Sequence, residues 1–310
     1  MRSKSFDLEE LPKSGFAEIG SILDKKKSLE LRDWIDHKRP ITHGIFYETE
    51  EEFRKFGRWN NYAPGRNDHN LLLSPELDLS FIEENAQFCD AMVKLCGADW
   101  QIFKKSIIRS VPRRAMPEWV RTKTQSVGRP NVNPFIIESH KDIQHFVTTD
   151  FHQDKTRAES DFVTVYIYID EVSNEDSPLV ILLNSQELGM SCYPHNLRRD
   201  VLNKNLWHYS NGRLNGSYNA HTVIGAAGSI ACFHCLTLHG TGFNDTEKPR
   251  ISLRYLIKKG NEEAASNSLL SQANMLIKGP LFIDPNRTDI AEDGSFLNTG
   301  SSLLSYSDLG

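Results

Sequence analysis

Four short, strongly β-prone runs dominate the second half of this chain and constrain its fold more than any other feature. Each is rich in β-branched and aromatic side chains, and they cover residues 162–169, 178–183, 228–236 and 250–257. Turn-forming residues separate them, notably over 172–178 and 210–219, and no helical pattern intervenes. Parallel strands would need long crossover connections. The order therefore predicts a mainly β fold with flanking helices, built as an antiparallel sandwich or barrel.

The rest of the chain is predicted to supply one further core strand and a set of helices. Alternating apolar residues over 12–22 indicate the strand. Asp24 is placed to cap a helix that follows it, and an amphipathic helix is expected over 81–97, where Gly97 ends it.

We expect a single domain of residues 1–310 rather than two domains. Its core strands lie within about 12–22 and 143–258. The remaining segments are read as peripheral, namely 40–135, with helices and a Pro- and Gly-rich lid, and 260–310, a polar C-terminal extension.

Composition points to an ordinary globular protein. The 310 residues are 39% hydrophobic and 25% charged, which is typical of a soluble domain. No apolar run approaches the roughly 20 residues of a membrane span, and the first residues lack the apolar segment of a secretory signal. Five cysteines without a framework spacing indicate a reduced chain. We therefore expect a cytoplasmic protein with no membrane partner.

The charge of the chain is uneven. Its net value of -5 indicates no nucleic-acid partner. Between Lys104 and Lys123, however, seven basic residues accompany the single acidic residue Glu118. Such a stripe is either a solvated face or a surface for an anionic substrate. In the second case, Arg113 and Arg114 are candidate substrate contacts.

Two metal-binding side chains occur close together in the triplet His152-Gln-Asp154. On an extended segment, residues two apart point to the same side, so both could reach one ion. The triplet alone is not specific, because His140-Lys-Asp142 has the same pattern.

The position of the first triplet in the chain makes it more informative. It lies just before the strongest strand run, a later strand run ends near His239, and Arg250 opens the next run. Two imidazoles and one carboxylate form the facial triad that leaves positions open on Fe(II). An arginine beyond the second histidine could bind a distant carboxylate bidentately.

The chain resembles the phytanoyl-CoA dioxygenase-like branch of the Fe(II)/2-oxoglutarate oxygenases. The resemblance covers roughly residues 12–36 and 145–257, and no usable resemblance extends over 40–135 or 260–310. The matching pieces are Phe151-His-Gln-Asp154, Val165-Tyr-Ile-Tyr-Ile-Asp170, Asp176-Ser-Pro-Leu-Val-Ile181, Asn184-Ser-Gln-Glu-Leu-Gly189, Ala227-Gly-Ser-Ile230 and His239-Gly-Thr-Gly with Pro249-Arg250. One departure is Ser177, which stands where the family usually has glycine.

This resemblance implies a double-stranded β-helix, a jelly roll of the cupin type. It implies an oxygenase that uses Fe(II), 2-oxoglutarate and O2 to oxidise, most simply to hydroxylate, a C–H bond of a small substrate, with release of succinate and CO2. Related iron halogenases carry Gly or Ala where Asp154 stands, which favours hydroxylation here.

The resemblance also implies roles for individual residues. The metal and catalytic residues are His152, Asp154 and His239. Arg250 would anchor the far carboxylate of 2-oxoglutarate, with the remaining cofactor contacts from Thr241, Ser252, Tyr166 and Gln153. Gln144 is a further candidate substrate contact, and Arg254 is read as structural or substrate-facing.

Two other classes of function remain open from the sequence. Cupin-like jelly rolls also serve as non-catalytic modules that bind sugars or other small molecules. A zinc protein could instead use Cys232, Cys235, His234 and His239. Against zinc, the C-x-x-C lies in an apolar run, where two packing cysteines are the simpler interpretation, and His234 reads as a satisfied core residue.

Overall fold

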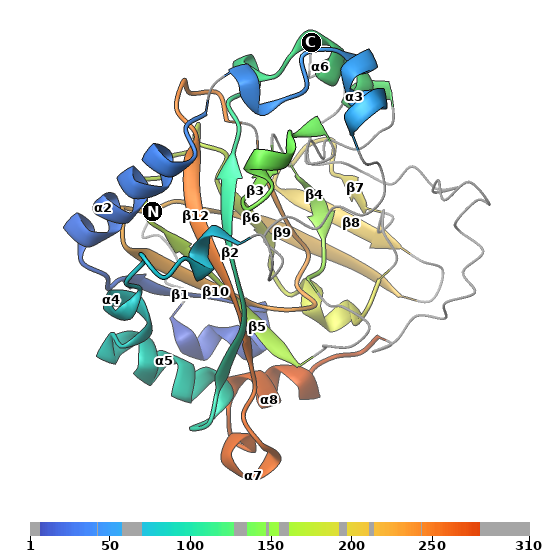
Figure 1. The fold of residues 1–310 in the computed structure, drawn as a ribbon. Coiled ribbons are helices and arrows are strands. Elements are labelled where there is room, and N and C mark those ends of the chain that lie inside the picture. The colour runs from blue at the N-terminus through green and yellow to red at the C-terminus, as the bar shows by residue number, and fades with distance from the viewer. Residues whose placement is uncertain are drawn as a thin grey trace.

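The protein is a sandwich of two six-stranded sheets, seen edge-on in Figure 1. The computed structural model describes residues 7–41, 43–57, 70–126, 135–146, 149–154, 161–191, 197–210, 214–242 and 244–279. In spatial order, the first sheet contains β1 (Phe16–Ser21), β10 (Ser229–His234), β5 (Phe162–Tyr168), β12 (Arg250–Lys258), β2 (Gln101–Ser110) and β3 (Gln144–Phe146). The second contains β4 (Thr149–His152), β11 (His239–Thr241), β6 (Leu179–Leu182), β9 (Asn215–Val223), β8 (Leu206–Ser210) and β7 (Leu197–Arg199).

Along two stretches of the chain, successive strands alternate between the two sheets. β4, β5 and β6 fall in the second, first and second sheet, and β9 to β12 repeat this alternation. The strand pairs are antiparallel except for β2 with β3. This alternation is the winding of a double-stranded β-helix, so the predicted fold class is confirmed. The two short strands that carry the histidines of the triad, β4 and β11, are direct neighbours.

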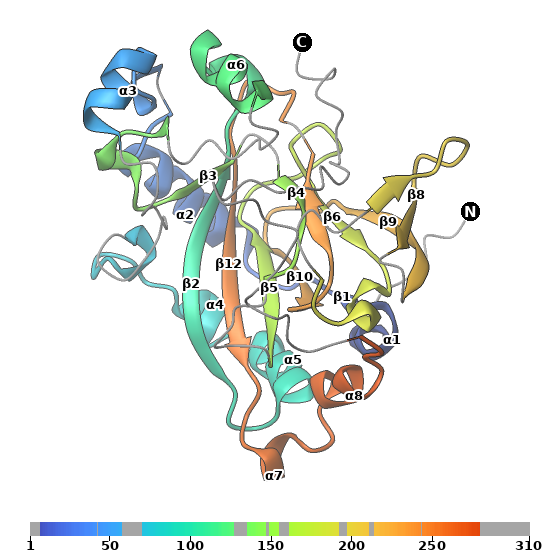
Figure 2. The same cartoon turned by 90° about the vertical axis from the view of Figure 1, so that its right-hand side faces the viewer.

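Helices cover the outer face of the first sheet (Figures 1 and 2). In the described part of the chain, the α-helices are α1 (Leu11–Ser14), α2 (Lys25–Lys38), α3 (Glu50–Phe56), α4 (Ser80–Glu83), α5 (Ala86–Cys96), α6 (Glu118–Ser126), α7 (Glu262–Ala265) and α8 (Leu269–Met275). Asp24 caps α2 by accepting from the backbone N–H of Lys27, as predicted. Within the described residues, no helix is both long and apolar enough to cross a membrane.

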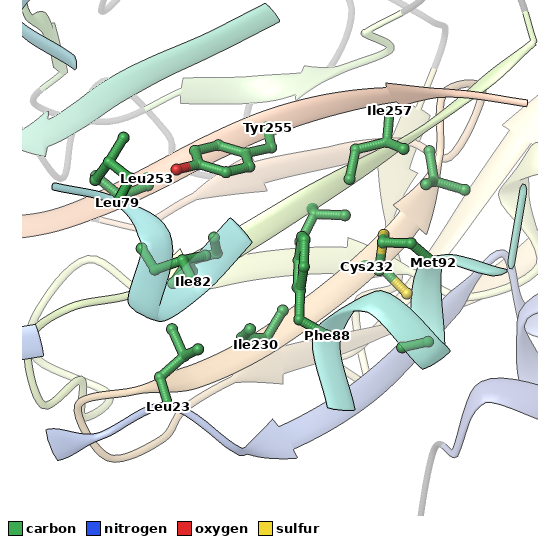
Figure 3. Close-up of a cluster of buried hydrophobic side chains, with 14 of the residues drawn as sticks. Leu23, Leu79, Ile82, Phe88, Met92, Ile230, Cys232, Leu253, Tyr255 and Ile257 are labelled. Carbon is green, nitrogen blue, oxygen red and sulfur yellow. The ribbon is translucent and has the colours of Figure 1, made fainter. Parts of the chain in front are cut away.

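The largest apolar cluster lies between these helices and the first sheet (Figure 3). Leu253, Tyr255 and Ile257 of β12 point into it, because alternate strand residues face opposite sides. Phe88 of α5 and Cys232 of β10 are fully buried there, and Cys232 forms no disulfide. The intervening residues of β12 face the second sheet, which is where the polar site is built.

Truncating the side chain of Phe88 tests this cluster. Phe88 is fully buried and packs edge-on against Trp100, with ring centroids 6.0 Å apart. We expect Phe88→Ala to lower the free energy of unfolding by about 3–5 kcal/mol, because it leaves a cavity. Val93→Ala on the exposed face of the same helix should change it by no more than about 0.5 kcal/mol. Urea denaturation measures both, and equal losses would contradict this packing.

The structure corrects several predicted boundaries. β2 falls outside the predicted core strands, yet it lies between β12 and β3 in the first sheet. Its charged residues on both faces hid the alternation of a strand. The helix predicted over 81–97 is two helices, because Asn85 caps a new one at Ala86, and that second helix ends at Gly97 as expected. Part of 12–22 is helical, since α1 precedes β1, and part of 210–219 belongs to β9.

Two stretches from opposite ends of the predicted peripheral segment 40–135 pack against each other. Phe46 pairs with Ile136 in an isolated antiparallel bridge, and both belong to one apolar cluster with Phe53 of α3 and Val120 of α6. Figure 1 shows α3 and α6 together at one end of the sandwich. Residues 58–69 and 127–134 of these segments lie outside the described part, as does 280–310 of the C-terminal extension.

Candidate metal centre

His152, Asp154 and His239 meet between the two sheets. His152 ends β4, Asp154 follows it, and His239 opens the neighbouring β11, directly opposite His152 in the register. One ligand atom from each of the three lies within 4.8 Å of the others. Among the described residues, this is the single group of three or more His, Cys, Asp or Glu side chains placed to hold a metal ion.

The distances within the group fit a shared ion. Nε2 of His239 lies 3.7 Å from Oδ2 of Asp154, and Nε2 of His152 lies 4.0 Å from Oδ1. The two imidazole rings have centroids 4.2 Å apart. All three donors point at one space, and their types are those of a facial triad for Fe(II).

His239 is in the form that a metal needs. Its Nδ1 donates to the carbonyl of Thr237 at 3.0 Å, which leaves the lone pair of Nε2 facing Asp154. Burial, reinforced by the neighbouring His152, lowers the pKa of His239 to about 3. The imidazole is therefore neutral near pH 7 and can act as a ligand.

Asp154 is held as a carboxylate by groups from the opposite sheet. Burial alone would raise its pKa, but the positive charge of Arg254, with the hydrogen bond from Thr164, holds that pKa well below its usual range. Nη1 of Arg254 donates to Oδ1 at 3.2 Å, and Oγ1 of Thr164 donates to Oδ2 at 2.7 Å. Sequence reasoning assigned no metal-site role to either residue.

The alternative zinc site does not form. His234 accepts from the backbone N–H of Leu236 through Nδ1 and bonds Oδ1 of Asn274 at 2.8 Å through Nε2. Both of its nitrogens are thus occupied, and His239 faces Asp154 instead. The imidazole of His234 joins β10 to α8, as expected of a satisfied core histidine.

Arg250 is a buried cation in the same interior. It is 2% exposed, and its Nη1 donates to Oγ of Ser252 at 2.8 Å and to the hydroxyl of Tyr166 at 3.3 Å. Its Nε is buried without a hydrogen-bond partner, and no described carboxylate forms an ion pair with it. A buried guanidinium left in this state is costly unless an anion joins it. The residues therefore fit the far carboxylate of 2-oxoglutarate.

The other predicted cofactor contacts are placed as follows. Tyr166 and Ser252 both support Arg250, and the guanidinium also lies over the rings of Tyr166 and Tyr168, 5.7 and 5.8 Å from their centroids. Thr241 is buried in β11, two residues after His239, and therefore on the same face of that strand.

Gln153 is used differently from the expectation. Its amide nitrogen donates to the carbonyls of Gly189 and Leu236 at 2.8 and 2.7 Å, and its oxygen accepts from the N–H of Ser191 at 2.9 Å. Because neighbouring residues of an extended segment point to opposite sides, Gln153 braces the backbone behind the triad.

The basic stripe does not form one surface. Lys105 pairs with Glu83 at 2.6 Å, and the fully buried Arg109 pairs with Asp36 at 3.0 Å under α2. These partners lie on the helix-covered face of the first sheet. These two residues therefore do not support the prediction of an anionic substrate.

The three candidate substrate contacts lie on two different elements of the fold. Arg114 is 79% exposed and pairs with Glu247. Arg113 begins a short 3-10 turn, and its side chain lies outside the described part. Gln144 lies in β3 in register with Ile108, which faces the second sheet, so Gln144 lies on the interior side.

Ser177 adopts a backbone conformation that favours glycine. Its φ of +56° lies in the left-handed region, where a side chain is strained. Its hydroxyl donates to the carbonyl of Gly242 at 2.6 Å, next to Thr241. This bond offsets part of the strain and ties the segment before β6 to the end of β11.

The fold and the site define a jelly-roll metalloenzyme with a His/Asp/His triad. A family model described as phytanoyl-CoA dioxygenase (PhyH) matches residues 68–252, which is more than half of the chain. The chain therefore belongs to the phytanoyl-CoA dioxygenase family of Fe(II)/2-oxoglutarate-dependent oxygenases, and its cofactors are iron and 2-oxoglutarate. The match includes 68–135, where the sequence analysis found no usable resemblance.

Several solved structures are similar to this chain at low sequence identity. The 2-oxoglutarate-dependent carbocyclase SnoK of nogalamycin biosynthesis is 12% identical, with 81% of this chain and 82% of that chain covered and a TM-score of 0.44. The epimerase SnoN, solved with Fe3+, α-ketoglutarate and nogalamycin RO, is 17% identical over 81% and 83%, with a TM-score of 0.48. EvdO2 from Micromonospora carbonacea var. aurantiaca, complexed with 2-oxoglutarate, is 17% identical over 82% and 90%, with a TM-score of 0.46. No curated protein matches the chain in sequence.

Proposed function

We propose that this protein hydroxylates a C–H bond of a small organic substrate at the centre formed by His152, Asp154 and His239. When bound, Fe(II) with 2-oxoglutarate and O2 supplies an oxidant for C–H bonds, with succinate and CO2 as co-products. The observation that carries the proposal is the pairing of the triad with Arg250, a buried guanidinium with an unsatisfied Nε in the same interior.

Each side chain has a separate task in this proposal. His239 and His152 provide neutral nitrogen donors, and Asp154 provides the single negative charge that the metal ligands contribute. Arg250 binds the far carboxylate of 2-oxoglutarate, oriented by Ser252 and Tyr166. Thr241, on the same strand face as His239, is the candidate second contact to that carboxylate.

The surroundings support the exclusion of water that such chemistry requires. His239 and Asp154 have side chains only 5% and 7% exposed, whereas that of His152 is 35% exposed. The ring of Phe233 lies 4.3 Å from that of His239 and closes the inner side. The substrate is therefore proposed to approach from the side of His152.

An anaerobic titration tests the proposal. Fe(II) and 2-oxoglutarate are added to the protein without O2, and we expect the weak visible metal-to-ligand charge-transfer band of a chelated keto acid. Succinate in place of 2-oxoglutarate is the control and should give no band. On admitting O2, slow formation of succinate from 2-oxoglutarate is expected. Absence of both the band and succinate would favour the non-catalytic binding module.

A further inference from the structure

Two side chains from adjacent strands hold both oxygens of the Asp154 carboxylate. Arg254 of β12 donates to Oδ1 at 3.2 Å, and Thr164 of β5 donates to Oδ2 at 2.7 Å. Both strands belong to the first sheet, whereas His152 and His239 belong to the second. The metal-ligand set and its hydrogen-bond partners therefore come from both sheets. Asp154 is the ligand that follows a strand of the second sheet and is hydrogen-bonded by residues of the first.

The backbone of Asp154 is fixed as well. Its N–H donates to the carbonyl of Cys235 at 3.1 Å, in the turn that leads from β10 to His239. Thr164 is fully buried and lies between Phe233 and Leu256 in the β-sheet register, so its hydroxyl has a defined position. Little rotational freedom is left to the Asp154 side chain before any metal arrives.

Both hydrogen bonds are compatible with a bound metal. A carboxylate offers about four lone-pair sites, two on each oxygen. Arg254 and Thr164 use one on each oxygen, which leaves one on each for an ion between Asp154 and the imidazoles. The contacts therefore do not compete with coordination for the same lone pairs.

Arg254 and Arg250 have distinct partners although they share a face of β12. Arg250 bonds Ser252 and Tyr166, while the ion pair that Arg254 forms is with Asp154. They are four residues apart, which is about 13 Å along a strand. One strand thus carries both the proposed cofactor anchor and the residue that supports the metal ligand.

We propose that Arg254 and Thr164 are positioning residues that hold the Asp154 carboxylate in its metal-binding orientation. This inference rests on the proposed function. The positive charge of Arg254 repels a divalent cation and so weakens metal binding. The gain in metal affinity from orienting the Asp154 carboxylate outweighs that repulsion. Groups that orient metal ligands are typically worth about 10- to 100-fold in metal affinity.

Co(II), whose visible absorption bands report coordination, is the probe for the test. We expect Arg254→Gln and Thr164→Val each to raise the Kd for Co(II) by about 10- to 100-fold. Arg254→Lys keeps the charge without the planar fork, so it should recover part of the loss. The double variant should lose less than the product of the single losses, because both act on Asp154.

Matched controls are available elsewhere in the fold. Arg32 pairs with Asp170 at 3.2 Å, the same distance as the Arg254–Asp154 pair, and Thr222 is an exposed strand threonine of β9. Arg32→Gln and Thr222→Val should leave the Kd for Co(II) within about twofold of wild type. Thermal unfolding without metal confirms that each variant folds.

The result that overturns the inference is a Kd for Co(II) within about twofold of wild type, or tighter, in both Arg254→Gln and Thr164→Val. A lowered Tm with unchanged Kd would give these residues a purely structural role and overturn it equally. The proposed function can fail separately. Wild-type protein that binds Co(II), yet makes no succinate when it is supplied with Fe(II), 2-oxoglutarate and O2, would contradict that function but not the positioning of Asp154.

Discussion

Asp154→Ala is expected to abolish tight metal binding and all succinate formation. The substitution removes the one anionic ligand and leaves two neutral imidazoles, of which only His239 is deeply buried. It also leaves Arg254, whose side chain is only 14% exposed, without its carboxylate partner, so the folded protein should lose stability as well. Succinate formation should fall at least about 1,000-fold, the scale expected when an essential catalytic group is removed. Measurement combines Co(II) binding, succinate formation and thermal unfolding.

The second H-x-D triplet provides the control for this prediction. Asp142 follows His140 with the same spacing, but it pairs with Arg39 at 2.8 Å and is not part of the metal group. Asp142→Asn should keep metal binding, although it weakens a partly buried ion pair. Succinate formation that survives in Asp154→Ala would refute the ligand assignment, since no other described carboxylate belongs to the group.

Arg250→Gln is expected to separate the binding of 2-oxoglutarate from the binding of metal. Truncating one partner of a buried, hydrogen-bonded charge pair costs about 2–5 kcal/mol. We therefore expect the Kd for 2-oxoglutarate to rise by about 25-fold or more, since each 1.4 kcal/mol is tenfold. The Kd for Co(II) should stay within about threefold of wild type, because Arg250 does not contact the triad. The anaerobic charge-transfer titration measures the first value.

Arg250→Lys and Arg199→Gln complete this experiment. Lysine keeps the charge but cannot reproduce the planar fork, so its affinity for 2-oxoglutarate should also fall. Arg199 is exposed on β7, at the edge of the second sheet, and its replacement should change neither affinity. Wild-type affinity for 2-oxoglutarate in Arg250→Gln would place the cofactor carboxylate elsewhere.

The four strand runs were predictable because their residues are either apolar on both faces of the strand or alternate strongly between apolar and polar. β5 is buried at every position, and β12 is buried at seven of its nine positions, so both read as β-prone from composition alone. β2 was not predictable in this way. Lys105 and Arg109 lie on its helix-covered face and pair with Glu83 and Asp36, which are brought there by α4 and α2. When the partner of a charged residue lies far away in the chain, the sequence alone does not distinguish that residue from a solvent-exposed one.

The triad and Arg250 could be proposed from the sequence because each stands at a fixed spacing from a predicted strand, and the family resemblance then implied their roles. Because side chains alternate between the two faces of a strand, a residue at or near a strand end can be assigned to one face from its position alone. Thr164 and Arg254 were not assigned to the site for the opposite reason. Thr164 lies within an apolar run, and Arg254 repeats the pattern of Arg250, so nothing local distinguishes a ligand-positioning role.

By itself, the sequence determined that His152 and Asp154 share one side of an extended segment and that His239 and Arg250 stand next to strand ends, which made them candidates for the chemistry. It determined this because local alternation and motif order do not depend on how the sheets close. Only the tertiary structure decided that Asp154, which follows a strand of the second sheet, contacts Arg254 and Thr164 of the first sheet. It also decided that Lys105 and Arg109 face the helices. Those contacts depend on register across β5 and β12 and on how the sheets pack, both of which involve residues far apart in the chain.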